Sequence, residues 1–176
     1  MKIEGTHQLN APRERVYALL TNPEVLRRCI PGCESLEKTE EDTYAATLKA
    51  GVGVVKGTFK GNVKLEEMRS PEHYRIVVDG KGGPGFVKGS GDFDLEAQDG
   101  RTLIRYVGGM QVGGTIAGVG QRMIQAAAKM MASQFFTALE AETAAEGEAP
   151  PKEGVFRTAL RWFSGWLRRL FQGSRN

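Results

Sequence analysis

Residues 55–65 decide the fold: Val55-Lys56-Gly57-Thr58-Phe59-Lys60-Gly61-Asn62-Val63-Lys64-Leu65. Apolar residues or glycines alternate with basic or polar residues, which is the period of a β-strand with one face toward a core. Two positions on the apolar face are glycines. Glycine inside a strand marks a bend or a close approach of another backbone. We therefore expect either a sharply curved sheet or a sheet with open space on its inner face.

Further strands surround this one along the chain. Strands are predicted at 2–9, from about Thr43, and at 73–79, 86–95 and 102–112. The stretch 86–95 again places glycines on its apolar side, and Asp99-Gly100 is a hairpin turn signal. Because successive strands are joined by short links, we expect an antiparallel meander.

Three helices complete the pattern. Pro12 suits the first position of one short helix. Asn22-Pro23 predicts the start of a second short helix, with Asn22 as the N-cap and Pro23 at its first position. Ile30-Pro31-Gly32 ends the second short helix. The longest helical segment is 115–142, with methionine, alanine and isoleucine on one side. The fold class predicted is α+β, with a strongly bent antiparallel sheet wrapped around a long C-terminal helix.

The chain carries little catalytic or metal-binding chemistry. Cys29 and Cys33 are its two cysteines, and their spacing lacks the further ligands of a zinc site, so we expect reduced thiols and no metal. His7 and His73 belong to no recognisable triad and are expected at surface positions of their strands. The glycine-rich run 112–120 lacks the Gly-Lys-Ser/Thr ending of a P-loop and predicts a tight turn from strand to helix. We expect a protein that is not an enzyme.

Charge is unevenly distributed. The whole chain has 176 residues and a net charge of +3, but residues 155–176 hold five arginines and no acid. The remainder is therefore slightly acidic, which gives no reason to expect nucleic-acid binding. The N-terminus has no apolar region of a signal peptide, and no apolar stretch is long enough to span a bilayer.

The C-terminal segment predicts a cationic amphipathic helix at 155–172, joined to a domain at 1–142 by a flexible Pro/Gly-bearing linker at 143–154. Its apolar half carries most of the predicted membrane-binding residues: Phe156, Leu160, Trp162, Phe163, Trp166, Leu167, Leu170 and Phe171. Its polar half carries Arg157, Arg161, Arg168 and Arg169. Aromatic residues opposite arginines are typical of an interfacial helix, although a groove on a partner protein uses the same stripe.

Four local motifs resemble the carbon monoxide dehydrogenase G-subunit family, a branch of the START-like helix-grip superfamily. They are Ala11-Pro12-x-x-x-Val16-Tyr17, Asn22-Pro23, Cys29-Ile30-Pro31-Gly32-Cys33 and Val112-Gly113-Gly114-x-Ile116-Ala117-x-x-Gly120. The resemblance covers residues 1 to about 142. It implies a helix-grip fold with a cavity between sheet and helix, and an accessory protein that brings a molybdenum-containing dehydrogenase to the cytoplasmic membrane. It supplies no catalytic residues.

A hollow apolar fold on a membrane-seeking tail suits the handling of a lipid. We expect a respiratory quinone, menaquinone or a similar isoprenoid quinone, as the bound ligand and no covalent cofactor. The expected partners are carbon monoxide dehydrogenase or a related molybdenum hydroxylase and the inner leaflet, with a cytoplasmic, peripheral location. The predicted cavity residues are Leu48, Phe59, Val63, Tyr74, Ile76, Phe93, Tyr106, Met110, Met123, Ala127 and Met131.

Two alternatives remain open from the sequence. One is a recruitment adaptor or maturation factor for the dehydrogenase that binds no lipid. The other is a cyclase- or hydrolase-type enzyme of the START-like fold, which needs polar acid and base groups inside the cavity. Tyr44, Tyr74 and Tyr106 are the candidates for such groups.

Overall fold

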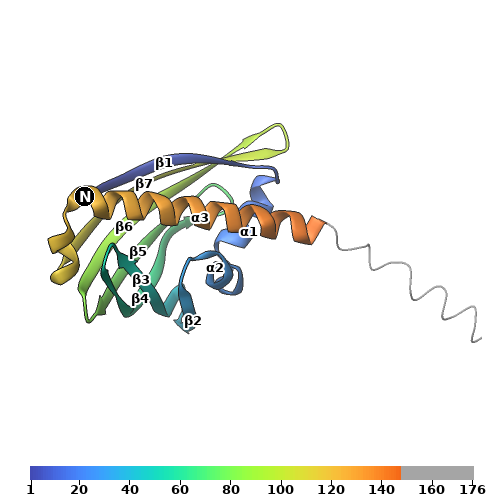
Figure 1. Ribbon diagram of the computed structural model, residues 1–176. Coiled ribbons are helices and arrows are strands. Elements are labelled where there is room, and N and C mark those ends of the chain that lie inside the picture. Colours follow the sequence, from blue (N-terminus) through green and yellow to red (C-terminus); the bar gives the residue numbers. More distant parts are fainter. Residues whose placement is uncertain (148–176) are drawn as a thin grey trace, which may run out of the picture. The chain divides into compact units, whose positions relative to one another are not determined.

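The computed structural model describes residues 1–147 as one curved sheet with three α-helices (Figure 1). The elements are β1 (Lys2–Leu9), α1 (Arg13–Leu20), α2 (Pro23–Cys29), β2 (Cys33–Glu40), β3 (Thr43–Val52), β4 (Val55–Arg69), β5 (His73–Gly82), β6 (Gly85–Gln98), β7 (Arg101–Gly113), the 3₁₀ helix η1 (Thr115–Val119) and α3 (Gln121–Gly147).

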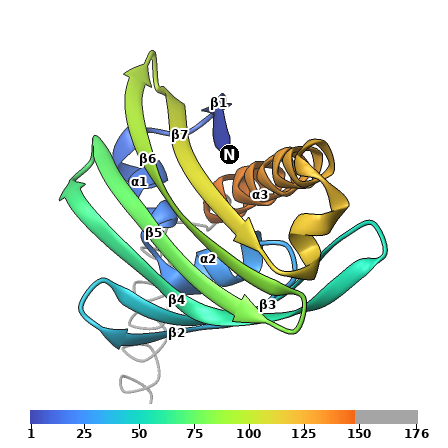
Figure 2. The ribbon, with the colours of Figure 1, turned by 90° about the vertical axis from the view of Figure 1, so that its left-hand side faces the viewer.

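The seven strands form one antiparallel sheet in the order β1-β7-β6-β5-β4-β3-β2. The sheet therefore runs as a meander from β2 to β7, and β1 closes its far side against β7. The strands curve around α3, and α1 and α2 lie at one end of it (Figure 2). This arrangement confirms the predicted α+β class with an antiparallel sheet bent around the C-terminal helix.

The short helices begin where the sequence predicts. The Asn22 side chain accepts a hydrogen bond of 2.9 Å from the backbone N–H of Glu24, and Pro23 opens α2. In α1, Pro12 stands one position earlier than predicted, as the residue that precedes the first turn. Its carbonyl accepts from the N–H of Val16 at 3.0 Å, which closes that turn.

Three features differ from the sequence prediction. Strand β2 was not predicted, because its acidic and basic residues give no alternation of apolar positions. The predicted helix 115–142 is two helices separated at Gly120, which has a positive φ of 93°. Helix α3 then continues to Gly147, five residues into the predicted linker. The rest of that linker and the predicted amphipathic helix at 155–172 lie outside the described residues.

The glycines of the inner face have two different causes. A Cβ at Gly61 would lie 1.9 Å from the carbonyl oxygen of Asp79, and one at Gly89 would lie 2.5 Å from that of Gly109. These positions exclude a side chain because the bent strands bring backbones together. At Gly80 and Gly91, by contrast, the nearest atoms lie 4.0 and 3.5 Å away. Curvature explains the first pair, whereas a Cβ at either position of the second pair would make only ordinary van der Waals contacts.

The buried side chains fall into two clusters. The larger one joins α1, α2 and the C-terminal half of α3 to the sheet, and it contains the fully buried Leu9, Val16, Ile104 and Leu139. The smaller one consists of Val52, Phe59 and Ile116 near η1, with partly buried neighbours. We call the end of the domain with the larger cluster the closed end and the end with η1 the open end.

Candidate ligand-binding surface

Aromatic rings fill the closed end. Tyr74, Phe93 and Tyr106 stand opposite one another on β5, β6 and β7. Their ring centroids are 4.9 Å apart for the first pair and 6.1 Å for the second, and the Tyr106 ring lies 5.4 Å from that of Phe136 on α3. We call these four rings the aromatic ladder. Gly5 on β1 makes room for it, since a Cβ at Gly5 would lie 2.4 Å from the Tyr106 hydroxyl. The rings leave this end of the fold tightly packed.

Polar contacts hold the C-terminal half of α3 at the same end. Arg28 donates two hydrogen bonds, of 2.8 and 2.7 Å, to the Glu142 carboxylate. Arg15 donates one of 2.7 Å to the backbone carbonyl of Thr143. The hydrogen bonds from Arg28 hold the pKa of the Glu142 carboxyl below its ordinary value, so this pair stays charged at neutral pH.

The first half of α3 is held differently. Within residues 1–147, no ion pair or side-chain hydrogen bond joins residues 121–132 to the sheet. Met123 and Met130 are about half exposed, although both lie on the helix that the sheet surrounds. This part of the helix is therefore positioned by apolar contacts alone.

Between the two clusters lies an apolar surface that neither of them fills. Leu48, Val78 and Met110 belong to the inward alternation of β3, β5 and β7, and Met131 lies on α3. All four are only half buried, and none belongs to either cluster. The unfilled positions Gly80 and Gly91 lie on the same face of the sheet. We call these six residues the inner apolar surface.

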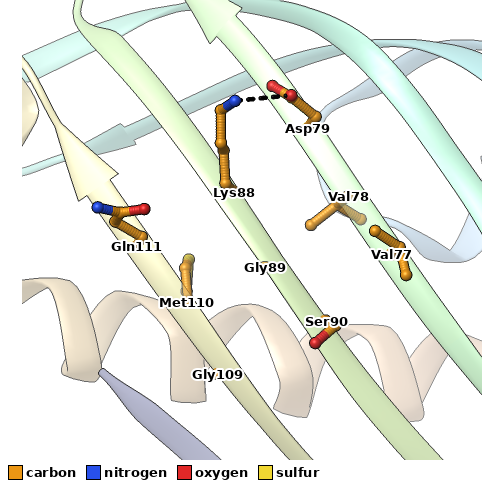
Figure 3. Close-up of a pocket in the computed structure, with 9 residues that line it drawn as sticks. All are labelled: Val77, Val78, Asp79, Lys88, Gly89, Ser90, Gly109, Met110 and Gln111. Atoms are coloured by element: carbon orange, nitrogen blue, oxygen red, sulfur yellow. Dashed lines mark ion pairs between the residues drawn. The ribbon is translucent and has the colours of Figure 1, made fainter.

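A depression of about 460 Å³ lies over the central strands nearby. Figure 3 shows its lining, which consists of one triplet of neighbours from each of β5, β6 and β7. The middle members, Val78, Gly89 and Met110, stand opposite one another in the sheet. Lys88 and Asp79 add an ion pair of 3.0 Å. The other six lining residues follow the outward alternation of their strands, so the depression lies mainly on the outer face of the sheet and is separate from the inner apolar surface.

The eleven predicted cavity residues divide among these regions. Tyr74 is a buried member of the larger cluster, and Val63, Ile76, Phe93 and Tyr106 pack against it. Phe59 belongs to the smaller cluster, and Ala127 packs against that one. Leu48, Met110 and Met131 lie on the inner apolar surface, whereas Met123 is about half exposed. Sequence reasoning missed Val78 and Gly80, which the alternation of β5 places on the inward face.

The prediction for His73 was wrong. It is buried, and its Nδ1 lies 2.7 Å from a carboxylate oxygen of Asp94. His7 is half buried and stacks on Phe136 with a centroid distance of 4.6 Å. Both rings contact residues that are distant in the sequence, Asp94 on β6 for His73 and Phe136 on α3 for His7, and the alternation of their own strands does not reveal these contacts.

The polar groups near the core have raised pKa values. Burial raises the pKa of the Tyr74 hydroxyl well above that of free tyrosine, and burial also raises the pKa of both thiols, Cys29 and Cys33. A raised pKa makes a thiol a weaker nucleophile at neutral pH. Neither cysteine forms a disulfide, and residues 1–147 hold no cluster of three or more His, Cys, Asp or Glu able to bind a metal.

The arrangement suits apolar binding. A surface of Leu, Val and Met beside unfilled glycine positions offers contact area to an apolar ligand of irregular shape, since Met side chains adapt to their surroundings. Residues 5–144 match the family model of the G subunit of carbon monoxide dehydrogenase (CoxG). The chain belongs to the CoxG family. The predicted resemblance is thereby confirmed over residues 5–144, which hold nearly all of α3 and all of the sheet except the first three residues of β1.

Solved structures share the fold of this chain. A conserved protein from Geobacillus kaustophilus is 38% identical, with a TM-score of 0.79, and the match covers 82% of this chain and 96% of that one. A START superfamily protein from Mycobacterium smegmatis shares the fold at 13% identity and a TM-score of 0.60, over 80% of this chain and 95% of that one.

A further structure with the fold is the ZhuI aromatase/cyclase from Streptomyces sp. R1128. It is 19% identical with a TM-score of 0.63, and the match covers 88% of this chain and 99% of that one. At this identity the likeness concerns the fold alone. Among curated protein sequences, none matches the chain significantly. Within the part of the chain that the structure describes, no helix is both long and apolar enough to cross a membrane.

Proposed function

We propose that this CoxG-family protein is a carrier that binds a respiratory quinone, menaquinone or a similar isoprenoid quinone, on its inner apolar surface. It passes the quinone between the cytoplasmic membrane and a carbon monoxide dehydrogenase or related molybdenum hydroxylase. The observation that carries this proposal is the half-buried apolar surface between the two core clusters, at Leu48, Val78, Met110 and Met131.

The energetics favour a long apolar ligand. Half-buried Leu, Val and Met side chains gain stability when a ligand removes them from water, at about 25 cal/mol per Å² of apolar area. An isoprenoid tail contributes ~0.8 kcal/mol per methylene-sized unit that it buries. A quinone with several isoprenoid units is therefore able to exchange between the fold and a bilayer, because both environments are apolar.

The C-terminal segment would supply the membrane contact. The helix expected from the sequence of residues 155–172 would place tryptophans and phenylalanines opposite arginines, which favours binding at the surface of an anionic bilayer. We expect Trp162→Glu with Phe163→Glu to weaken strongly the pelleting of the full chain with anionic liposomes. Circular dichroism should show an unchanged domain. If the double variant pellets as well as the parent chain, the segment binds protein and the membrane anchor is wrong.

Native mass spectrometry tests the carrier directly. The full chain is purified from membranes of cells that make menaquinone, without delipidating detergent, and its mass is measured with and without collisional activation. We expect a bound species with the mass of the quinone. A folded protein that carries no quinone or other lipid would refute the carrier and leave the recruitment adaptor as the function.

A further inference from the structure

The open end of the domain carries an exposed apolar tip. The β3–β4 hairpin turns through Gly53 and Val54, and the positive φ of Gly53, 60°, suits the first central position of a type II′ turn. Val54 at the apex is 97% exposed. Met123 lies beside this turn, since its terminal methyl is 3.5 Å from the Cβ position of Gly53. Asn, Asp or Gly is usual at such an apex, and at this exposure the Val54 side chain contributes almost no burial to the fold.

Cations surround this tip. Residues 43–65 contain four lysines and no acid, and residues 107–132 contain Arg122, Lys129 and no acid. Five of the cations at this end form no ion pair within residues 1–147. They are Lys56, Lys60, Lys81, Arg122 and Lys129.

Two of these placements are unfavourable for the isolated domain. Lys60 and Lys81 stand directly opposite each other on β4 and β5, where like charges repel. Arg122 lies in the first turn of α3, where the helix dipole disfavours a cation. Both placements become favourable when an anionic surface covers this end.

The tip, η1 and the β5–β6 turn lie at the same end of the fold, and the β6–β7 hairpin lies at the other (Figures 1 and 2). We propose that the open end docks directly on an anionic lipid bilayer, with Val54 and Met123 inserted among the headgroups and the unpaired cations against the lipid phosphates. A bilayer is favoured over an acidic protein because the most exposed residue of the tip is apolar and sits at a loop apex. This inference rests on the proposed carrier function and deepens it. The purpose of docking is to bring the inner apolar surface to the membrane.

A single-tryptophan reporter tests the docking on the full chain. The chain has two tryptophans, both in the C-terminal segment, so Trp162→Phe with Trp166→Phe removes them while keeping aromatic residues there. Val54→Trp then places the sole indole at the tip, and nothing packs on that position. Ala97→Trp, at an exposed position beside the opposite hairpin, is the matched control. The probe is a vesicle of phosphatidylglycerol with brominated acyl chains, which quench a nearby indole.

We expect strong quenching and a blue shift at position 54 and neither at position 97. Adding Lys60→Glu and Lys81→Glu to the Val54→Trp protein should remove the quenching, as should neutral phosphatidylcholine vesicles. Equal quenching at both positions, or none at 54 while the protein pellets with the vesicles, would overturn the proposal. No pelleting at all would overturn it together with the membrane anchor. The quinone measurement above is independent of every one of these outcomes.

Discussion

The two ends of this domain share one sheet but differ in how they hold α3. At the closed end an aromatic ladder, two short helices and the Arg28–Glu142 pair fix the C-terminal half of α3. At the open end the same helix has exposed methionines and no polar contact to the sheet among the described residues. The difference teaches that stability is concentrated at one end, so that the other can keep an apolar surface uncovered.

The largest expected effect is on stability at the closed end. Leu139 is fully buried on α3, and Leu139→Ala should lower the free energy of unfolding by about 2–5 kcal/mol, through lost burial and the cavity left behind. Met130→Ala, on the exposed part of the same helix, should change it by less than about 0.5 kcal/mol. Urea denaturation followed by circular dichroism measures both. Equal losses would mean that both halves of α3 are packed alike.

The next effect is on binding at the open end. Gly80 has space above it on the inner face, so Gly80→Leu should fill part of the inner apolar surface without unfolding the domain. A leucine that displaces even two methylene-sized units of ligand costs ~1.6 kcal/mol, or more than about tenfold in affinity for a short-tailed menaquinone.

Gly109→Leu is the matched control for that experiment. A Cβ at Gly109 also meets no atom within 4 Å, but the position follows the outward alternation of β7. Titration of both variants by native mass spectrometry should show weaker quinone binding for Gly80→Leu alone. Unchanged binding in both variants would place the ligand elsewhere.

The smallest effect concerns the Arg28–Glu142 pair. Because the pKa of Glu142 is lowered in the folded protein, its stabilising contribution is present above the ordinary value of 4.5 and is lost as the pH falls through the folded value. Glu142→Gln should therefore be slightly less stable than the parent at pH 7 and equally stable at strongly acidic pH. Glu140→Gln, an exposed neighbour, should show no such pH dependence in urea denaturation. If the stability difference between Glu142→Gln and the parent persists at strongly acidic pH, the charge of Glu142 is not its cause.

Most strands of the sheet could be predicted because their apolar positions alternate clearly and because Asp99-Gly100 marks the turn between β6 and β7. The sequence did not predict β2, whose charged residues lie at a sheet edge. It also placed His73 on the surface, because the burial of this ring beside Asp94 depends on tertiary contacts that alternation does not report. Glycine positions could be found in the sequence, but only the backbone distances separate Gly61, which curvature requires, from Gly80, which leaves space.

The apolar character of the candidate site could be predicted from the sequence, but only some of its residues could. Leu48, Met110 and Met131 followed from alternation and from the helix stripe, and they do lie between the clusters. Tyr74 and Phe59 follow the same alternation, yet they are core residues, since position along a strand decides which cluster a side chain joins. Periodicity reports the face of a strand and not the distance from its end.

Hydrogen exchange with and without bound menaquinone tests the central claim most directly. In the free protein, amides at 121–132 should exchange faster than those at 133–143. Loading with a short-tailed menaquinone, verified by native mass spectrometry, should slow exchange at 121–132 and in the adjoining part of β6 from Gly85 to Gly91. Slowing confined to α1 and α2, or none at all in a loaded protein, would contradict the account that the ligand binds on the inner apolar surface, between the two clusters.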